Sequence, residues 1–321
     1  MKKNILITGG FGLLGKVLVL RLINLKHNVF ILEKKNTKRL KFLPKKPKKI
    51  IAGDFTNKKL VGKIIKDNKI NVIYHLGAIT QVLDSLKDPY KTHQINVMGT
   101  INFLENIRLI NRKIIFIYSS SDKAYGELKN RQEYKEGDSL DSVYPYDVSK
   151  SASDLICQSY CKTYSIKVGI IRCGNIYGPG DFNLKRLIPE VILSTIEKKN
   201  FIIRSDGKST RDYVYVEDVA DAYLKLFKKI KNSKDKLKIY NVSSKFNYSV
   251  LEIVNMILKK MNNTKLKPKV LNNSKQELNF QRLNYSKIRR ELKWNPKIDI
   301  ETGLKKTIDW YVKFYSFLKK K

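Results

Sequence analysis

The stretch "NILITGGFGLLGKVLVLRLINLKHNVFILEKK", Asn4 to Lys35, decides the fold of this chain. A β-branched apolar run leads through Gly9, Gly12 and Gly15 into apolar residues at helical spacing, and a second apolar run ends at Glu33. This order predicts a strand, a glycine turn, a helix and a second strand. Glycines at this spacing allow a tight turn, close approach of backbone N–H groups to a pyrophosphate and close packing of helix on strand. A glycine-rich turn without a ligand is the alternative, but this context favours a dinucleotide site.

The acid at the end of the second run indicates which dinucleotide binds. A carboxylate at Glu33 can accept hydrogen bonds from the adenosine ribose hydroxyls and would repel a 2′-phosphate, which favours NAD over NADP. Lys34 and Lys35 oppose that choice, because either could reach a 2′-phosphate. We expect NAD.

Four further apolar runs alternate with helix-length stretches, and each ends in polar or small residues. Strands alternating with helices predict an α/β fold, a doubly wound parallel sheet of the Rossmann type, which binds ligands where its strands end. The four runs are "KIIAGDF" (Lys49 to Phe55), "NVIYHLGAIT" (Asn71 to Thr80), "KIIFIYSSS" (Lys113 to Ser121) and "VGIIRCGNIYG" (Val168 to Gly178), and "HQINVMGTINFLENI" and "SKSASDLICQSYCKTY" read as single crossover helices.

The regular alternation is lost beyond Gly178, where prolines punctuate the chain. We expect residues 1–178 to form the NAD-binding domain and residues 179–321 to form mainly a smaller, mixed α/β lobe that binds the substrate. Within the second half, "DYVYVEDVADAYLKLFKKI" and "KIYNVSS" carry strand and helix patterns. Residues 213–243 are therefore expected to return to the sheet.

The formal charge of +36 arises from 65 Lys and Arg residues against 29 Asp and Glu residues. The basic runs are spread along the chain and are not interleaved with stacking aromatics, which favours solvated lysine-rich faces over nucleic-acid binding. No apolar run reaches transmembrane length, so we expect no membrane partner and a cytoplasmic location. Cys157, Cys161 and Cys173 lie in apolar segments at a spacing that fits no zinc pattern, and they are expected to be buried thiols.

Tyr146 and Lys150, in "YDVSK", have the four-residue spacing that places both side chains on one face of a helix. A nearby ammonium stabilises phenolate and lowers the tyrosine pKa, so that the phenol can act as a base near neutral pH. This pattern occurs by chance in many helices. Together with the glycine turn and Ser121 at a strand end, it forms a consistent set.

At this point the sequence resembles the extended short-chain dehydrogenase/reductases that act on nucleotide sugars. The resemblance implies that Ser121 orients the substrate, that Tyr146 removes a sugar hydroxyl proton, and that Lys150 binds the nicotinamide ribose and tunes Tyr146. It covers nearly the whole chain through "TGGFGLLG", "GDF", "HLGAIT", "NVMGT", "SSSDKAYG", "YPYDVSK", "RCGNIYGPGD", "RLIP", "RDYVYVEDVADAY" and "LKWNPKIDIETGLKKTIDWY".

The same motifs imply a set of binding residues and a homodimer formed by the segments Asn96 to Ile107 and Ser149 to Tyr164. Gly77 departs from the family pattern, in which Ala is more usual, and we expect it to enlarge the space beside the cofactor. The nucleobase pocket is expected in and near "KQELNFQRLNYSK". The residues implied to contact the cofactor are Gly9, Phe11, Gly12, Leu13, Gly15, Glu33, Asp54, Phe55, Leu76, Gly77, Ala78, Asn96, Tyr146 and Lys150, and those implied to contact the substrate are Gln81, Ser121, Asn175, Arg186 and Arg211.

Asp122 and Lys123 distinguish the possible reactions. Epimerases of the family usually carry small neutral residues after the catalytic Ser or Thr, whereas dehydratases need a proton donor for the leaving C6 oxygen and a base for the C5 proton. "SDK" resembles the Asp-Lys version of CDP-glucose 4,6-dehydratases and of some UDP-N-acetylglucosamine dehydratases, with Lys123 or a residue near it as the base. A turn with an incidental ion pair is the structural alternative. A 4-epimerase and a non-catalytic dinucleotide sensor are the competing functions.

The sequence does not assign a role in the reaction to His75, His93 or Gln81. His75 and His93 are expected to satisfy local hydrogen bonds, because no His, Cys or carboxylate cluster at ligand spacing accompanies them, so no metal site is expected. Gln81 follows a strand end and could contact the hexose or cap the next helix.

Overall fold

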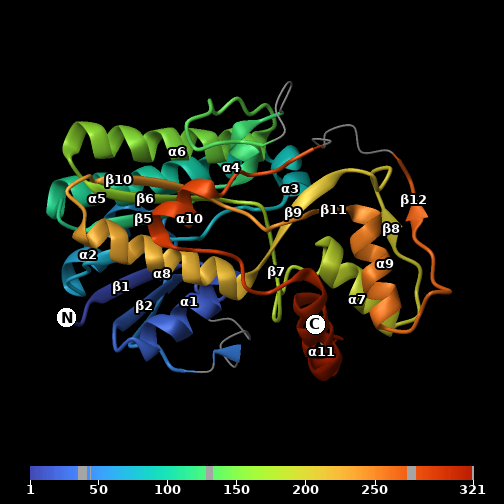
Figure 1. Cartoon of the computed structure of the whole chain (residues 1–321). Coiled ribbons are helices and arrows are strands. Elements are labelled where there is room, and N and C mark those ends of the chain that lie inside the picture. The colour runs from blue at the N-terminus through green and yellow to red at the C-terminus, as the bar shows by residue number, and fades with distance from the viewer. Residues whose placement is uncertain (35–41, 44, 128–132, 273–279, 320–321) are drawn as a thin grey trace.

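Strand β1 (Asn4–Thr8) lies inside a seven-stranded sheet of order β10-β6-β5-β4-β1-β2-β3, in which all neighbouring strands run parallel. The computed structural model describes residues 1–34, 42–43, 45–127, 133–272 and 280–319. The predicted doubly wound Rossmann sheet is confirmed (Figure 1). Its other strands are β2 (Asn28–Glu33), β3 (Lys49–Ala52), β4 (Val72–His75), β5 (Ile115–Ser119), β6 (Lys167–Cys173) and β10 (Leu237–Val242).

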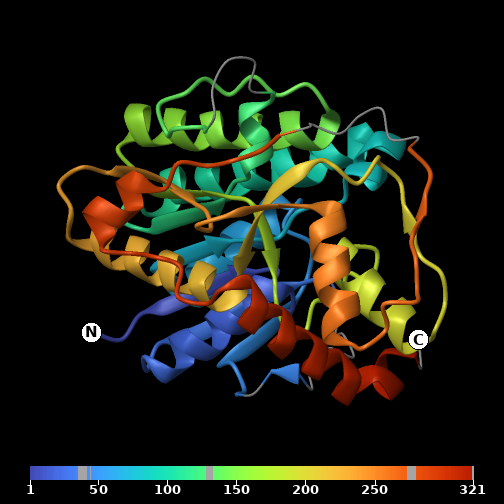
Figure 2. The same ribbon diagram turned by 45° about the vertical axis from the view of Figure 1, so that its right-hand side comes forward.

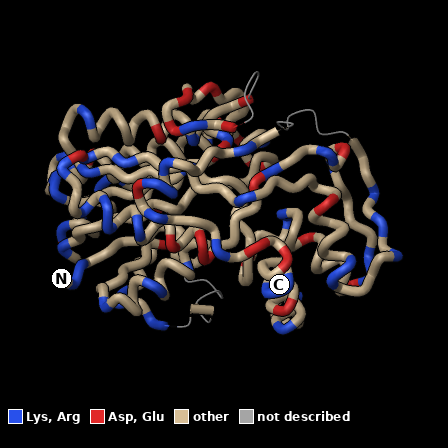
Figure 3. Tube along the Cα trace, viewed as in Figure 1, with Lys and Arg blue, Asp and Glu red and all other residues tan. Residues whose placement is uncertain are grey.

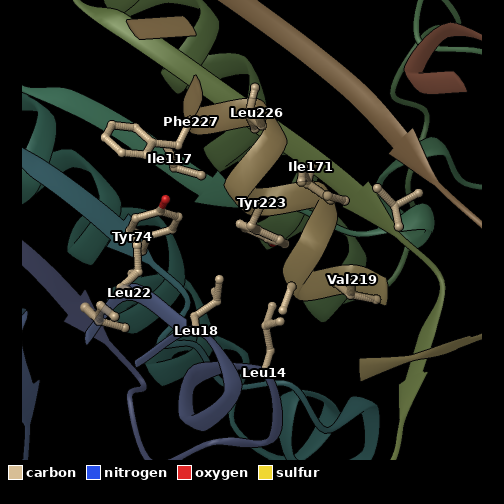
Figure 4. Packing of buried hydrophobic residues seen from close by; sticks show 14 of the residues in the cluster. Leu14, Leu18, Leu22, Tyr74, Ile117, Ile171, Val219, Tyr223, Leu226 and Phe227 are labelled. Carbon is tan, nitrogen blue, oxygen red and sulfur yellow. The ribbon is translucent and has the colours of Figure 1, made fainter. Parts of the chain in front are cut away.

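Helices cover both faces of this sheet. Helices α1 (Leu13–Asn24) and α8 (Val216–Asn232) pack on one face, where Leu14 and Leu18 of α1 lie across from Tyr223 of α8 (Figure 4). Helices α2 (Lys58–Asp67), α5 (Gly99–Ile110) and α6 (Pro145–Tyr164) pack on the other face. The inner strands are thus buried from both sides, as their near-continuous apolar runs require, whereas the edge strand β3 is partly exposed.

The segment expected to be one crossover helix is instead built in three parts. Helix α4 (Pro89–His93) continues into a π-helical turn over Gln94–Met98 and then into α5. Asn96 in this turn bonds the backbone of Ile79 in both directions, at 2.8 and 3.0 Å, and donates to Ser149 Oγ at 2.9 Å. The wide turn lets one side chain bind the loop after β4 and helix α6 at once.

A second group of elements lies beside the carboxyl ends of the strands (Figures 1 and 2). A three-stranded sheet of order β11-β9-β7 joins β7 (Asn175–Tyr177), β9 (Thr210–Tyr215) and β11 (Asn247–Ser249), and β8 (Ile202–Ile203) pairs with β12 (Lys269–Val270). Residues 213–243 were expected to return to the main sheet. Helix α8 and β10 do so, but β9 pairs with β7 and β11, because the chain leaves the main sheet after β6. The other helices are α3 (Val82–Lys87), α7 (Leu187–Ile196), α9 (Val250–Lys260), α10 (Ser286–Leu292) and α11 (Ile300–Lys319).

A buried ion pair joins β6 to α6. Arg172 is 1% exposed and donates to both carboxylate oxygens of Asp154, at 2.9 Å each. Its third contact is Tyr125 Oη at 2.9 Å, and Tyr125 in turn donates to Asn241 Oδ1 on β10 at 2.7 Å. Tyr125 ends the short 3₁₀ helix η3 (Asp122–Tyr125), so this network fixes η3 against the sheet.

The charges of the surface are dispersed rather than gathered. Lys and Arg are scattered over both groups of elements, with Asp and Glu between them (Figure 3). Among the described helices, none is both long and apolar enough to cross a lipid bilayer. The three cysteines are unbridged and buried, as expected.

Replacing Arg172 by Met should lower the free energy of unfolding by about 3–5 kcal/mol, because it leaves Asp154 as a buried charge without its partner. Urea denaturation followed by circular dichroism measures the loss. Lys199→Met is the matched control, since it removes an exposed ion pair with Glu197 of 2.7 Å and should hardly move the midpoint. Equal small effects of both variants would contradict a structural role for the buried pair.

Candidate active site

The glycine turn after β1 is too narrow for side chains at its key positions. Gly9 has φ +68°, in the left-handed region, and its carbonyl accepts a hydrogen bond from Gly12 N–H at 3.0 Å. A Cβ on Gly15 would lie 2.1 Å from the Gly9 oxygen. Gly12 is the N-cap of α1 and has no side chain to bond the helix's free N–H groups, which leaves them available to a phosphate.

The loop after β4 lies directly against this turn. A Cβ on Gly9 would lie 3.1 Å from the Gly77 nitrogen, and Thr8 Oγ1 accepts hydrogen bonds from the N–H groups of Leu76 at 3.1 Å and Gly77 at 2.9 Å. The expectation that Gly77 enlarges the space beside the cofactor is wrong. A Cβ there would meet the Phe55 ring at 3.0 Å and Thr8 Oγ1 at 3.1 Å, so protein atoms already surround that position.

Several residues implied to contact the cofactor can do so only through their backbone. The side chains of Phe11, Leu13 and Phe55 are buried in the two cores that flank the sheet. Asn96 is 2% exposed, and its side chain forms hydrogen bonds with the loop after β4 and with Ser149. Backbone N–H groups suffice to bind a dinucleotide, and the half-buried Leu76 and Ala78 line the same loop.

Two carboxylates lie near each other, one at the end of β2 and one in the loop after β3. Glu33 ends β2, and its carbonyl accepts from Gly53 N–H at 2.8 Å, which places Asp54 beside it. Lys34 forms an ion pair with Asp54 at 2.9 Å. Burial acts to raise the pKa of Asp54, but hydrogen bonds from Thr56 and Lys34 hold it below its usual value. Lys34 is thereby engaged by a carboxylate, and Lys35 lies outside the described residues. These groups and the glycine turn fit NAD.

The predicted catalytic residues meet between η3 and the first turn of α6. Ser121 Oγ donates to Asp122 Oδ1 at 2.9 Å and accepts from Lys123 N–H at 3.2 Å. Tyr146 is 8% exposed and interacts with Ser121 through a hydrogen bond. Burial raises the pKa of Asp122, although Lys123, Ser121 and Arg211 act to lower it. The structure thus brings Ser121, Asp122 and Tyr146 together.

The Lys150 ammonium contacts strand β5. It donates to the Ser119 carbonyl at 2.7 Å and lies over the Tyr118 ring, and burial lowers its pKa to about 8. Burial is also the main influence on Tyr146 and raises its pKa, opposed by the hydrogen bond with Ser121. In the protein alone, therefore, the predicted lowering of the Tyr146 pKa is not found, because burial outweighs nearby positive charge.

Three of the residues predicted to contact the substrate belong to the second group of elements. Arg186 precedes α7, donates to Asp181 Oδ2 at 3.0 Å and acts to lower the Tyr146 pKa. Arg211 on β9 is 6% exposed and acts on Asp122. Asn175 opens β7 and is exposed. Gln81 does not cap α3 with its side chain; it donates to Asn183 Oδ1 at 2.5 Å, across to the loop before α7.

Histidines take no part in this site. His75 is buried, bonds Thr8 Oγ1 at 2.9 Å and has its pKa lowered to about 3 by burial and by Lys150. Within the described ranges, no group of three or more His, Cys, Asp or Glu side chains is arranged to hold a metal ion.

Sequence reasoning missed two buried polar side chains at the site. Asp147, directly after Tyr146, is 2% exposed, and Gln281 is 1% exposed and accepts from Lys123 Nζ at 3.3 Å. Neither residue can be recognised as part of the site from the sequence alone. Asp147 has the pattern of an ordinary acid in the first turn of a helix, and Gln281 lies in an irregular segment. The expected nucleobase segment, residues 275–287, is described only from Phe280 onward.

Residues 5–243 match the model of the NAD dependent epimerase/dehydratase family. Human dTDP-D-glucose 4,6-dehydratase is 28% identical over an alignment of 321 positions, which covers 96% of this chain and 90% of the human protein. A dTDP-glucose 4,6-dehydratase from Bacillus anthracis, solved with NAD, aligns with a TM-score of 0.86 at 26% identity over 99% of both chains. A UDP-glucuronic acid 4-epimerase from Bacillus cereus, solved with UDP-glucuronic acid and NAD, aligns with a TM-score of 0.88 at 25% identity over 97% of this chain and 100% of that chain. The NAD dependence of the family confirms the expected cofactor.

Asp54→Asn should narrow the preference for NAD over NADP severalfold, because it releases Lys34 from its ion pair of 2.9 Å toward a 2′-phosphate. Calorimetric titration of cofactor-free protein with each dinucleotide measures both affinities. Asp67→Asn, at the end of α2, serves as the matched control and should leave the preference unchanged. An unchanged ratio in Asp54→Asn would show that Lys34 does not influence the site.

Asp147→Asn should raise the free energy of unfolding near neutral pH. Burial raises the pKa of Asp147 to about 6, above the ordinary aspartate value of 3.8. The folded state therefore holds this proton more tightly than the unfolded chain, and stability falls as pH rises between those two values. The gain should be about 1–3 kcal/mol at about pH 7 and should shrink toward zero near about pH 4. Urea denaturation at both pH values tests this, and a gain that does not depend on pH would contradict it.

Proposed function

Since this chain belongs to the NAD dependent epimerase/dehydratase family, as its resemblance to the extended short-chain dehydrogenase/reductases predicted, we propose that it is a 4,6-dehydratase of a nucleoside-diphosphate hexose. The product is a 4-keto-6-deoxy sugar nucleotide. The name of the human relative and that of the Bacillus anthracis structure support this reaction.

The observation that carries the proposal is the position and state of Asp122. It lies on η3, is 4% exposed and accepts a hydrogen bond from Ser121. Burial raises its pKa, which favours the protonated acid that a leaving hydroxyl requires. An incidental turn acid would be exposed to water, whereas this one is enclosed beside Tyr146. The contacts of Asp122 therefore support a proton donor for the C6 oxygen.

The roles proposed for the other residues are those that the family resemblance implies. Tyr146 accepts the C4 hydroxyl proton, and Ser121 orients that hydroxyl. When bound, the nicotinamide supplies the hydride acceptor for C4 and the hydride donor for C6. Lys150 binds the nicotinamide ribose. Arg186, Arg211 and Asn175 hold the diphosphate, for which guanidinium groups are suited by their forked geometry.

A 4-epimerase is the second candidate, and the likeness to the Bacillus cereus 4-epimerase supports it. An epimerase oxidises C4 with the same Tyr146 but has no leaving group to protonate. It offers no reason to bury an acid at position 122. A non-catalytic dinucleotide sensor would need neither Tyr146 nor the arginines.

For the nucleobase we propose cytidine first, on the resemblance of Asp122–Lys123 to CDP-glucose 4,6-dehydratases. The human relative and the Bacillus anthracis protein are named for dTDP-glucose, which makes thymidine the alternative. The enzyme can be incubated with CDP-, dTDP-, UDP- and GDP-glucose, and mass spectrometry then shows which of the four substrates loses water fastest.

Asp122→Asn separates the two reactions. The amide keeps the size of the side chain but has no acidic proton, so C4 oxidation should survive while water loss falls by on the order of 10²–10⁴-fold. The near-ultraviolet absorbance of reduced nicotinamide should rise on mixing with substrate and persist, whereas it should be transient in the wild type. Asp141→Asn, an exposed acid beyond η3, is the control and should behave as the wild type. Recovery of a C4-inverted sugar of unchanged mass from every variant would refute the dehydratase.

A further inference from the structure

Gln281 is a buried amide that contacts the residue next to the proposed acid. Its side chain is 1% exposed, and its Oε1 accepts a hydrogen bond from Lys123 Nζ at 3.3 Å. The oxygen must face Lys123, because an ammonium can only donate and the amide nitrogen would be a second donor. Lys123 directly follows Asp122 in η3. Gln281 therefore reaches the proposed reaction centre through Lys123, from a segment 158 positions further along the chain.

The amide nitrogen of Gln281 points to a role other than stability. Nε2 is buried and has no hydrogen-bond partner among the described residues. A buried N–H without a partner costs free energy, and an apolar side chain of the same shape avoids that cost. Asn106 shows the structural use of a buried amide, since its Nδ2 donates to the carbonyls of Lys58 and Asn102 at 3.0 and 2.8 Å. The contact that distinguishes Gln281 is the one with Lys123.

The backbone at Gln281 is held by the three-stranded sheet. The Gln281 carbonyl accepts a hydrogen bond from Asn247 Nδ2 of β11 at 2.9 Å, and Leu283 N–H donates to Asp212 Oδ2 of β9 at 2.9 Å. Asn247 and Asp212 are register partners in that sheet. The amide is thus carried by a backbone that is fixed at two points, and its oxygen is a fixed acceptor for Lys123.

Lys123 needs such an acceptor at the end of its side chain. Its backbone N–H donates to Ser121 Oγ at 3.2 Å, but a flexible four-carbon stem separates this fixed point from Nζ. Within the described ranges, Gln281 is the one hydrogen-bond partner of Lys123 Nζ, and no carboxylate forms an ion pair with it. The position of the nitrogen therefore depends on Gln281.

A neutral acceptor suits a lysine that acts as a base. To take a proton, the side chain must be the neutral amine, which has two N–H groups and one lone pair. A carboxylate partner would favour the ammonium and so oppose the base, whereas an amide oxygen accepts an N–H from either form without adding a charge. Once one N–H is held by Oε1, fewer directions remain open to the lone pair.

We propose that Gln281 is a positioning residue for the C5 proton transfer, in which its Oε1 holds an N–H of Lys123 and so directs the lone pair of the neutral amine toward the sugar. The assignment rests on the proposed 4,6-dehydratase function and on Lys123 as its base, the role that the family resemblance implies.

The proton transfer that Gln281 supports has a closed balance. Once C4 is a ketone, the Lys123 nitrogen forms an N–H bond with the C5 proton, and the C5–H electron pair forms the C5–C6 double bond. The C6–O bond breaks, and Asp122 gives its proton to the departing oxygen, which leaves as water. Lys123 then returns a proton to C5 as hydride adds to C6. The proton that Tyr146 took from the C4 hydroxyl balances the one that Asp122 gave.

The first test is proton exchange at C5 in deuterium oxide. Wild-type enzyme with the nucleotide glucose that it dehydrates should place deuterium at C5 of the product. Gln281→Met should still oxidise C4, shown by the near-ultraviolet absorbance of reduced nicotinamide, but should exchange C5–H on the order of 10²-fold more slowly, because the base is misplaced. The KM for the nucleotide sugar should stay the same. Gln94→Met, the same substitution at an exposed position, is the matched control and should behave as the wild type.

Gln281→Glu tests the neutral charge of the acceptor. The variant keeps the shape of the side chain but places a carboxylate at Lys123, which favours the ammonium. The acidic limb of the pH–rate profile for C5 exchange should therefore move upward by roughly one to two pH units. The other charged groups of this region, Asp122 of η3, Asp147 of α6 and Arg211 of β9, are the same in both proteins.

A purely structural role predicts different results. If Gln281 only stabilises the fold, Gln281→Met should lower the urea midpoint and leave C5 exchange per folded molecule unchanged, and this outcome would overturn the proposal. A raised KM with normal C5 exchange would also overturn it, because Gln281 would then bind the substrate. Exchange at the wild-type rate in Lys123→Met would remove the base on which the assignment rests. If the wild type releases no water from any nucleotide hexose, the proposed function itself fails.

Discussion

The ion pair between Arg172 and Asp154 is the interaction on which the active site depends. It joins β6 to α6 with both partners buried, and its continuation through Tyr125 fixes the far end of η3. Asp122 begins η3, and Tyr146 lies in the first turn of the helix that carries Asp154. The pair therefore holds the proposed acid and the proposed C4 base at a fixed separation. A buried pair has little net value for stability, but it specifies one arrangement of its elements.

Much of the fold follows from the sequence because its signals are local. The glycine turn needs no distant partner, since the steric limits at Gly9 and Gly15 arise within a few residues. Strand runs buried on both faces likewise reveal the parallel sheet. The pairing of β9 could not be predicted in this way. Its apolar pattern suits either sheet, and only the course of the chain after β6 assigns it to β7 and β11.

The residues of the candidate site can likewise be separated into those with a local sequence signal and those without one. Ser121, Tyr146 and Lys150 are recognisable because their chemistry depends on spacing within one motif or at one strand end. The neighbours of Asp147 and Gln281 come from η3 and β9, which are remote in the sequence, so their importance appears only in three dimensions. Gly77 shows the converse error. A missing Cβ suggests free space in a sequence, whereas the Phe55 ring fills that space in the fold.

The overall charge of the protein does not determine the charge state of its active site. A chain with formal charge +36 would be expected to hold its carboxylates ionised. Yet burial raises the pKa values of Asp122 and Asp147, each against opposing local contacts. The reason is distance: salt screens exposed charges beyond about 8–10 Å, while desolvation acts at the group itself. The lysine-rich surface and the raised carboxyl pKa values of the site are therefore compatible, because each is governed by its own surroundings.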